Sequence, residues 1–257
     1  MSNRVENVPP LLNRVAVVTG ASRGLGRAVA VALAAAGADV AVTARSLDGL
    51  RGVVDDVTAL GRRAVPVACD VTSWDSVSAL AELVADALGV PDVLVNNAGI
   101  VVESPLAETD PAEWQRLMDT NVNGVFYGCR AFGPAMIKRG GGVVINMSSA
   151  FGEMGVPGVV GYCASKAAVS QLSRALAVEW ARYGVRVNAI APGYIATDMT
   201  ASLQADPEVA KHALRIVPQR RFGRPDEIGS LAVYLASDVS AFVTGEVITI
   251  DGGMTAR

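Results

Sequence analysis

Two side chains of one helical segment, Tyr162 and Lys166, have the types and the spacing that proton transfer requires. Residues four apart share one face of a helix. A tyrosine phenol has a pKa of about 10, so at neutral pH it transfers protons poorly unless its phenolate form is favoured. A neighbouring ammonium favours that form, and we expect Lys166 to lower the pKa of Tyr162. Taken alone the pair is weak evidence, because this spacing is also common on wet helix surfaces.

Two hydroxyl groups precede this pair, where Ser148 and Ser149 close an apolar run that ends at Met147. A hydroxyl at the end of a strand can hydrogen-bond a carbonyl oxygen and stabilise the alkoxide-like oxygen that forms from it. Ser149 stands thirteen residues before Tyr162. Together these side chains indicate acid–base chemistry on a carbonyl or an alcohol.

A glycine-rich loop, TGASRGLG from Thr19 to Gly26, lies between an apolar run and an alanine-rich helical run. Gly20, Gly24 and Gly26 let the backbone turn sharply and bring bare N–H groups, at a helix N-terminus, against a diphosphate. A glycine cluster alone is usually just a turn. The strand before it and the helix after it favour a nucleotide site.

The end of the second expected strand indicates which dinucleotide binds. A carboxylate at this place would hydrogen-bond the ribose 2′-hydroxyl of NAD, but the chain has Ala44 there, followed by Arg45. Arg45 and Arg23 would pair with a 2′-phosphate through charge-assisted bonds. NADP(H) is therefore the preferred cofactor and NAD(H) the alternative, which would hold if these arginines were only solvated surface charges.

Short β-branched runs alternate with longer helical runs, a pattern typical of βαβ units and a parallel sheet. We predict an α/β protein with one Rossmann domain over residues 1–257, a doubly wound seven-stranded parallel sheet with helices on both faces. The expected strands are 15–19, 40–43, 64–69, 93–95, 143–147, 185–190 and 247–250. The expected helices are 24–36, 47–60, 73–88, 111–138, 160–183 and a shorter one after Pro225. Residues 194–217 fit neither pattern and are expected to form a substrate lid, with a surface helical hairpin as the alternative.

The G-x-x-x-G-x-G spacing of the loop is similar to the first motif of the short-chain dehydrogenase/reductase family. The other family motifs that the chain resembles follow in order: NNAG at 96–99, S-x-x-G from Ser149, Y-x-x-x-K from Tyr162, and PG at 192–193. The match runs from about Val15 to Gly253. The chain is identified as a member of this family, and it resembles the 3-oxoacyl-[acyl-carrier-protein] reductase-like ketoreductases within it.

The resemblance implies a catalytic set and a cofactor site. The catalytic set is Asn121, Ser149, Tyr162 and Lys166, in which the serine orients the carbonyl, the tyrosine donates a proton, the lysine binds the cofactor ribose, and the asparagine binds a relay water. Asn123 is the nearby competitor of Asn121. The residues implied for the cofactor are Gly20, Ser22, Arg23, Leu25, Gly26, Arg45, Asp70, Val71, Asn97, Ala98, Gly99, Tyr162, Lys166, Pro192, Gly193, Ile195 and Thr197. Of these, Asp70 and Thr197 also suit a turn or a helix cap.

The residues expected around the reacting carbonyl are mostly apolar, which favours a ketone with a hydrophobic body. They are Ser149, Phe151, Glu153, Met154, Val156, Tyr194, Met199 and Leu203, with Val101 beside them. Glu153 either recognises a polar end of the substrate or is a solvated loop carboxylate. The first functional reading is an NADPH-dependent reductase of 3-oxoacyl thioesters or hydrophobic ketones. The alternatives are an NAD(P)-dependent sugar-acid, polyol or steroid alcohol dehydrogenase and, from another class, a non-catalytic nucleotide-binding scaffold.

Composition excludes several other functions. A net charge of −3 without a Lys/Arg cluster argues against nucleic acid, and no apolar run reaches the roughly 18 residues of a membrane span. The polar N-terminal stretch predicts no signal peptide. Three cysteines without metal-type spacing predict reduced thiols and a cytoplasmic protein, and one histidine makes a metal site or a serine–histidine triad improbable. We expect a small-molecule substrate and a homotetramer built through helices 111–138 and 160–183 and the C-terminal segment.

Overall fold

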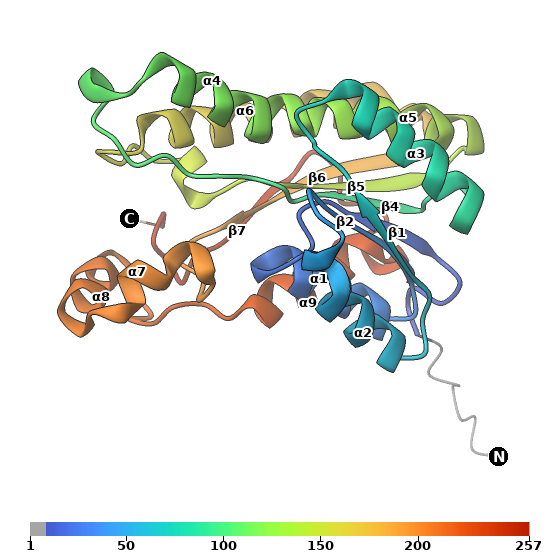
Figure 1. Cartoon of the computed structure of the whole chain (residues 1–257), viewed down its shortest axis with the longest axis horizontal. Helices are drawn as coiled ribbons and strands as arrows, with labels where there is room; N and C mark the ends of the chain where they lie inside the picture. The colour runs from blue at the N-terminus through green and yellow to red at the C-terminus, as the bar shows by residue number, and fades with distance from the viewer. Residues whose placement is uncertain (1–8, 257) are drawn as a thin grey trace.

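Seven parallel strands form one sheet at the centre of the computed structural model, which describes residues 9–256 (Figure 1). The strand order is β3-β2-β1-β4-β5-β6-β7. The strands are β1 (Val15–Val18), β2 (Asp39–Ala44), β3 (Ala64–Ala68), β4 (Val93–Asn96), β5 (Gly142–Met147), β6 (Val185–Pro192) and β7 (Val247–Ile250). The order reverses direction between β1 and β4, and ligands of such sheets bind at the carboxyl ends of the strands beside this point. The predicted fold class is confirmed.

Helices cover both faces of the sheet, as Figure 1 shows. The first face carries α1 (Gly24–Ala35), α2 (Arg51–Ala59) and α9 (Pro225–Ala236), and the second carries α3 (Trp74–Leu88), α4 (Pro111–Met118), α5 (Gly124–Arg139) and α6 (Val160–Trp180). A separate apolar cluster fills the space on each side of the sheet. All four residues of β1 are buried, which explains why that strand is apolar throughout.

The helix expected over residues 111–138 is interrupted, which corrects that prediction. It ends at Met118, and one π-helical turn, Asp119–Asn123, separates it from α5. A π turn inserts one extra residue into a helix and redirects the neighbouring side chains. Here it brings the fully buried side chain of Asn121 against the loop that follows β4.

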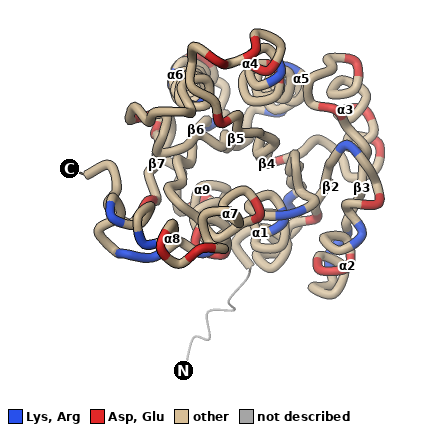
Figure 2. The backbone as a smooth tube through the Cα atoms, turned by 60° about the vertical axis from the view of Figure 1, so that its left-hand side comes forward, with Lys and Arg blue, Asp and Glu red and all other residues tan. Residues whose placement is uncertain are grey.

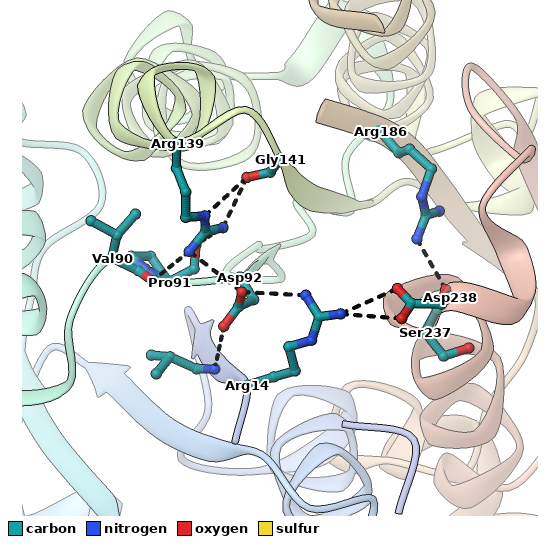
Figure 3. A network of polar contacts seen from close by, with 10 residues as sticks. Arg14, Val90, Pro91, Asp92, Arg139, Gly141, Arg186, Ser237 and Asp238 are labelled. Carbon is teal, nitrogen blue, oxygen red and sulfur yellow. Dashed lines mark hydrogen bonds and ion pairs between the residues drawn. The ribbon is translucent and has the colours of Figure 1, made fainter. Parts of the chain in front are cut away.

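A polar network closes the amino edge of the sheet, opposite the expected ligand edge (Figure 3). Asp92 accepts from the backbone N–H of Val15 at 2.8 Å and pairs with Arg14 and Arg139, each at 3.4 Å. Arg14 also reaches Asp238, and Arg186 donates to the carbonyl of Ser237. These contacts join β1, β4 and β6 to the ends of α5 and α9, so we assign the network a structural role.

The segment between β6 and α9 extends beyond the sheet and carries two short helices, α7 (Ala201–Ala205) and α8 (Pro207–Ala213), at the lower left of Figure 1. A 3₁₀ turn, η7 (Leu214–Ile216), follows α8. This is the segment that the sequence singles out as a lid. Over residues 9–256, no helix has the length and apolar character to cross a membrane. Most of the stretch on which the signal-peptide prediction rests, residues 1–8, lies outside the described residues.

Candidate active site

The glycine loop lies between β1 and α1 with a shape that side chains would fill. Gly20 and Gly24 have φ angles of +64° and +54°, which favour glycine. A Cβ on Gly26 would collide with the carbonyl oxygen of Gly20, and a Cβ on Gly20 would lie 2.9 Å from the Cα of Ala98. The loop is thus a bare backbone cradle at a helix N-terminus, which fits a diphosphate.

Hydrogen bonds join this loop to the NNAG segment after β4. The amide Nδ2 of Asn97 donates to the carbonyl oxygens of Thr19 and Gly20 at 2.9 and 3.1 Å. The Thr19 hydroxyl accepts the backbone N–H groups of Asn97 and Ala98 at 2.9 and 3.1 Å. Sequence reasoning missed Thr19, although it belongs to the loop motif. Asn96 is buried and donates to Asn146, so it fastens β4 to β5.

The residues expected around the adenosine end lie at the exposed ends of β2 and β3. The Asp70 carboxylate accepts both the backbone N–H and the hydroxyl of Thr72, and these bonds hold the pKa of Asp70 below its usual value, with Arg45 adding to the effect. Ser73, rather than Asp70, caps α3. Arg23 pairs at 3.7 Å with Asp198 at the start of the lid segment. Arg45 is thus the cation that lies toward Asp70, whereas Arg23 faces the lid.

Ser149, which is buried, and Tyr162, which is half-buried, lie side by side. Ser149 is 7 % exposed, and its Oγ accepts the backbone N–H of Phe151 at 3.1 Å. Burial raises the pKa of the Tyr162 phenol, and a hydrogen bond with Ser149 opposes that rise. The net shift is therefore upward, opposite to the lowering expected from Lys166, because desolvation is its largest cause.

Lys166 is 4 % exposed, and its ammonium donates to the carbonyl oxygen of Met147 at 2.7 Å. Burial lowers the pKa of Lys166 to about 8. The same Nζ stands 5.6 Å from the centre of the Tyr162 ring. The Ser148 hydroxyl bonds the Lys166 carbonyl at 2.9 Å and Ser170 at 2.8 Å, and so ties α6 to the end of β5.

Asn121 is tied into the site by both ends of its amide. Its Oδ1 accepts the N–H of Ile100 at 2.8 Å, and its Nδ2 donates to the Ile100 carbonyl at 2.9 Å and to Ser165 Oγ at 3.0 Å. A Cβ on Gly99 would lie 3.3 Å from Asn121 Oδ1 and 3.4 Å from Lys166 Nζ. The competitor Asn123 instead donates to Asp119 at 2.7 Å. Asn121 and Lys166 therefore both lie beside Gly99, whereas Asn123 bonds within its own turn.

An aromatic wall stands beside Tyr162. The rings of Phe151 and Tyr162 meet edge to face with centres 6.4 Å apart, and those of Phe151 and Tyr194 do so at 5.7 Å. Phe151, Met154 and Tyr194 pack on one apolar cluster with the buried residues Ala150, Val217 and Met254. Glu153 is exposed and lies 4.0 Å from Arg174 on α6.

Other predicted residues lie outside this cluster. Pro192 ends β6, and its carbonyl accepts from Ser149 at 3.5 Å, whereas Gly193 packs on Asp251. Thr197 is the N-cap of a 3₁₀ turn, and its methyl group faces Gly24 of the glycine loop. The remaining expected positions, which lie outside the apolar cluster, are Ser22, Leu25, Val71, Val101, Val156, Ile195, Met199 and Leu203.

The family model described as "Enoyl-(Acyl carrier protein) reductase" matches residues 20–255. The chain is 42% identical over 246 residues to a 3-oxoacyl-[acyl-carrier-protein] reductase of Synechocystis, covering 95% of this chain and 98% of the relative. The chain belongs to the short-chain dehydrogenase/reductase family.

Two further relatives show the breadth of this family. A gluconate 5-dehydrogenase of Gluconobacter oxydans is 40% identical over 240 residues, which cover 93% of this chain and 94% of the relative. A crystal structure of a gluconate 5-dehydrogenase from Burkholderia cenocepacia, in complex with NADP and tartrate, superposes with a TM-score of 0.93 at 35% identity and covers 97% and 98% of the two chains. As a short-chain dehydrogenase/reductase, the chain is an oxidoreductase that acts on alcohol and ketone groups, as predicted.

Proposed function

We propose that the chain is an NADPH-dependent ketoreductase that prefers 3-oxoacyl thioesters or ketones with a hydrophobic body. The observation that carries this proposal is the Ser149–Tyr162 pair of hydroxyl groups beside the aromatic wall of Phe151 and Tyr194. The hydroxyl pair suits a carbonyl oxygen, and the wall suits an apolar substituent.

In this mechanism Ser149 orients the carbonyl oxygen and Tyr162 donates its proton to that oxygen in reduction. Lys166 holds the cofactor ribose and keeps a cation near the phenolate that remains. Asn121 stands between Ile100, Ser165 and Lys166, where it would position the water that reloads the proton. The nicotinamide, when bound, supplies the hydride for the carbonyl carbon. The glycine cradle and the NNAG segment would hold its dinucleotide.

The choice of NADP(H) over NAD(H) rests on the end of β2. Ala44 stands where a carboxylate would bind the ribose of NAD, and Arg45 follows it, exposed and near Asp70. The Arg23 side chain, across the loop, is 77 % exposed and forms an ion pair with Asp198 at 3.7 Å. The Burkholderia cenocepacia relative, which was crystallised with NADP, supports the same choice.

A sugar-acid, polyol or steroid alcohol dehydrogenase is the second candidate, and the gluconate 5-dehydrogenase relatives favour it. The residues at the site favour the ketoreductase. The flanking side chains are aromatic or aliphatic, and Glu153, in the same loop as Phe151, has the same sign of charge as a carboxylate substrate. A non-catalytic scaffold is disfavoured because all four members of the catalytic set are present and gathered.

A substrate panel separates these functions. Oxidation of NADPH and of NADH would be followed with acetoacetyl thioesters, aryl ketones, cyclic diketones and keto-sugar acids. NADPH-dependent turnover of a thioester or aryl ketone, at least tenfold above that of the keto-sugar acids, is the expected result. Preferential turnover of keto-sugar acids would replace the ketoreductase with the dehydrogenase, and preference for NADH would overturn the role given to Arg45.

We also propose a cytoplasmic homotetramer in which residues 194–217 close over the substrate. Exposed apolar side chains support the interfaces: Val178 on α6 is 84% exposed, and Val239 and Phe242 beyond α9 are 80% and 103% exposed. Sedimentation of Val178→Glu and Phe242→Glu variants tests this arrangement. Each is expected to yield dimers, and tetramers in both would contradict it.

A further inference from the structure

A groove on the lid gathers three cations that the mechanism above does not use. It measures about 780 Å³ and is lined by Pro207, Ala210, Lys211, Leu214, Arg215 and Arg220. Lys211 and Arg215 are four residues apart on α8 and η7, and the turn after η7 brings Arg220 to them. The sequence has no Lys/Arg run here, but the fold brings these cations together. Figure 2 shows blue Lys and Arg segments beside α8.

The charge of this lid groove is poorly balanced. Lys211 pairs with Glu208 at 3.7 Å. Among residues 9–256, no carboxylate oxygen lies within 4.0 Å of a side-chain nitrogen of Arg215 or Arg220. The Arg220 guanidinium donates to the carbonyl oxygen of Leu214, at 3.3 Å. Two guanidinium groups therefore remain available for an anion, and guanidinium geometry suits phosphate oxygens.

The backbone conformation of Arg220 also indicates a role for its side chain. Its φ is +53°, in the left-handed region that a side chain with a Cβ rarely adopts. A hydrogen bond from its N–H to the Val217 carbonyl, at 2.9 Å, holds the turn. Glycine would make the same turn without strain, and retained strain of this kind points to a role of the side chain.

The apolar lining of the groove connects it with the catalytic centre. Leu214 lines the groove and also packs on the cluster of Ala150, Val217 and Met254. Phe151 and Tyr194 pack on the same cluster, and Phe151 meets the ring of Tyr162. A ligand that extends over Leu214 would thus run from the cations toward the reacting carbonyl.

We propose that the lid groove binds the phosphate-bearing pantetheine arm of a thioester substrate, with the phosphate at Arg215 and Arg220. This inference rests on the proposed function, because the ketone at the far end of the arm is the group that is reduced. The terminal phosphate of such an arm would meet the cations, and its extended chain would lie along the apolar lining of Pro207, Ala210 and Leu214. Coenzyme A thioesters and carrier-protein thioesters share this chemistry.

Calorimetric binding tests the groove without requiring turnover. 4′-Phosphopantetheine and pantetheine would each be titrated into protein saturated with NADP⁺, so that the dinucleotide site is filled. Wild type is expected to bind the phosphorylated arm about tenfold more tightly than pantetheine. Equal affinities, or no binding of either compound, would overturn the proposal.

The deciding variant is Arg215→Gln/Arg220→Gly, which removes both charges and leaves a residue that suits the left-handed turn. This double variant should bind 4′-phosphopantetheine with an affinity within twofold of that for pantetheine. Lys138→Gln, an exposed cation at the end of α5, is the matched control and should keep the wild-type preference. A preference that survives in the double variant would refute the assignment.

Kinetics keep this inference separate from the proposed function. The ratio of kcat/KM for acetoacetyl-4′-phosphopantetheine to that for acetoacetyl-N-acetylcysteamine should fall about tenfold in the double variant. If neither thioester is reduced, the proposed function fails and calorimetry still decides the groove. Comparison of acetoacetyl-coenzyme A with acetoacetyl-loaded acyl carrier protein then distinguishes the two sources of the arm.

Discussion

Replacement of Asn121 by alanine should destabilise the protein far more than the same change two residues later. The Asn121 amide is fully buried and makes three hydrogen bonds, to both backbone groups of Ile100 and to Ser165. Each contributes about 1 kcal/mol net, and buried partners left unpaired raise the loss, so we expect about 3 kcal/mol. Asn123 makes one partly buried hydrogen bond, to Asp119, and its loss should cost about 1 kcal/mol or less.

The two substitutions form a matched pair, because both lie in the same π-helical turn and change helix propensity equally. Urea unfolding followed by circular dichroism, at one protein concentration, gives the two free energies of unfolding. Steady-state turnover should also fall strongly in Asn121→Ala and little in Asn123→Ala. Equal losses of stability in the two variants would refute the account of Asn121 as the buried anchor of this turn.

Gly26→Ala should weaken NADPH binding at least tenfold in a fluorescence titration, because its Cβ would collide with the Gly20 carbonyl; unchanged affinity would contradict the cradle. Burial lowers the pKa of Lys166 to about 8, so the folded protein loses this proton at a lower pH than the unfolded chain does. Wild-type stability relative to Lys166→Met should therefore rise by about 3 kcal/mol between pH 8 and pH 10.5, measured by urea unfolding; a flat difference would contradict the burial. Burial raises the pKa of the Cys129 thiol to about 12 and also raises that of Cys69. Cys163, which is half-buried, should therefore be the one thiol that reacts rapidly with Ellman's reagent in native protein. In urea all three thiols should react, and rapid reaction of more than one thiol in native protein would contradict the burial.

The parts of the fold that the sequence predicted correctly are those with a local signal. The apolar run of β1, the glycine turn and the helical spacing of Tyr162 and Lys166 each depend on neighbours along the chain. The NNAG segment could be placed because parallel strands end at the same edge of a sheet.

The remainder depends on contacts between distant segments. The π turn at Asp119–Asn123 has no periodic signature, since the hydrophobic pattern on both sides continues as in an uninterrupted helix. The direction of the Lys166 ammonium depends on the Met147 carbonyl, which the end of β5 supplies. The basic lid groove exists only because a strained turn returns Arg220 to Lys211 and Arg215.

The most direct test of the proposed mechanism is the Tyr162→Phe variant. Phenylalanine keeps the edge-to-face contact with Phe151 and removes only the hydroxyl that lies beside Ser149. The variant should bind NADPH within about twofold of wild type in a fluorescence titration, and lose about 100- to 10,000-fold in turnover of the best carbonyl substrate. Turnover near the wild-type rate, with NADPH still bound, would contradict the assignment of Tyr162 as the proton donor.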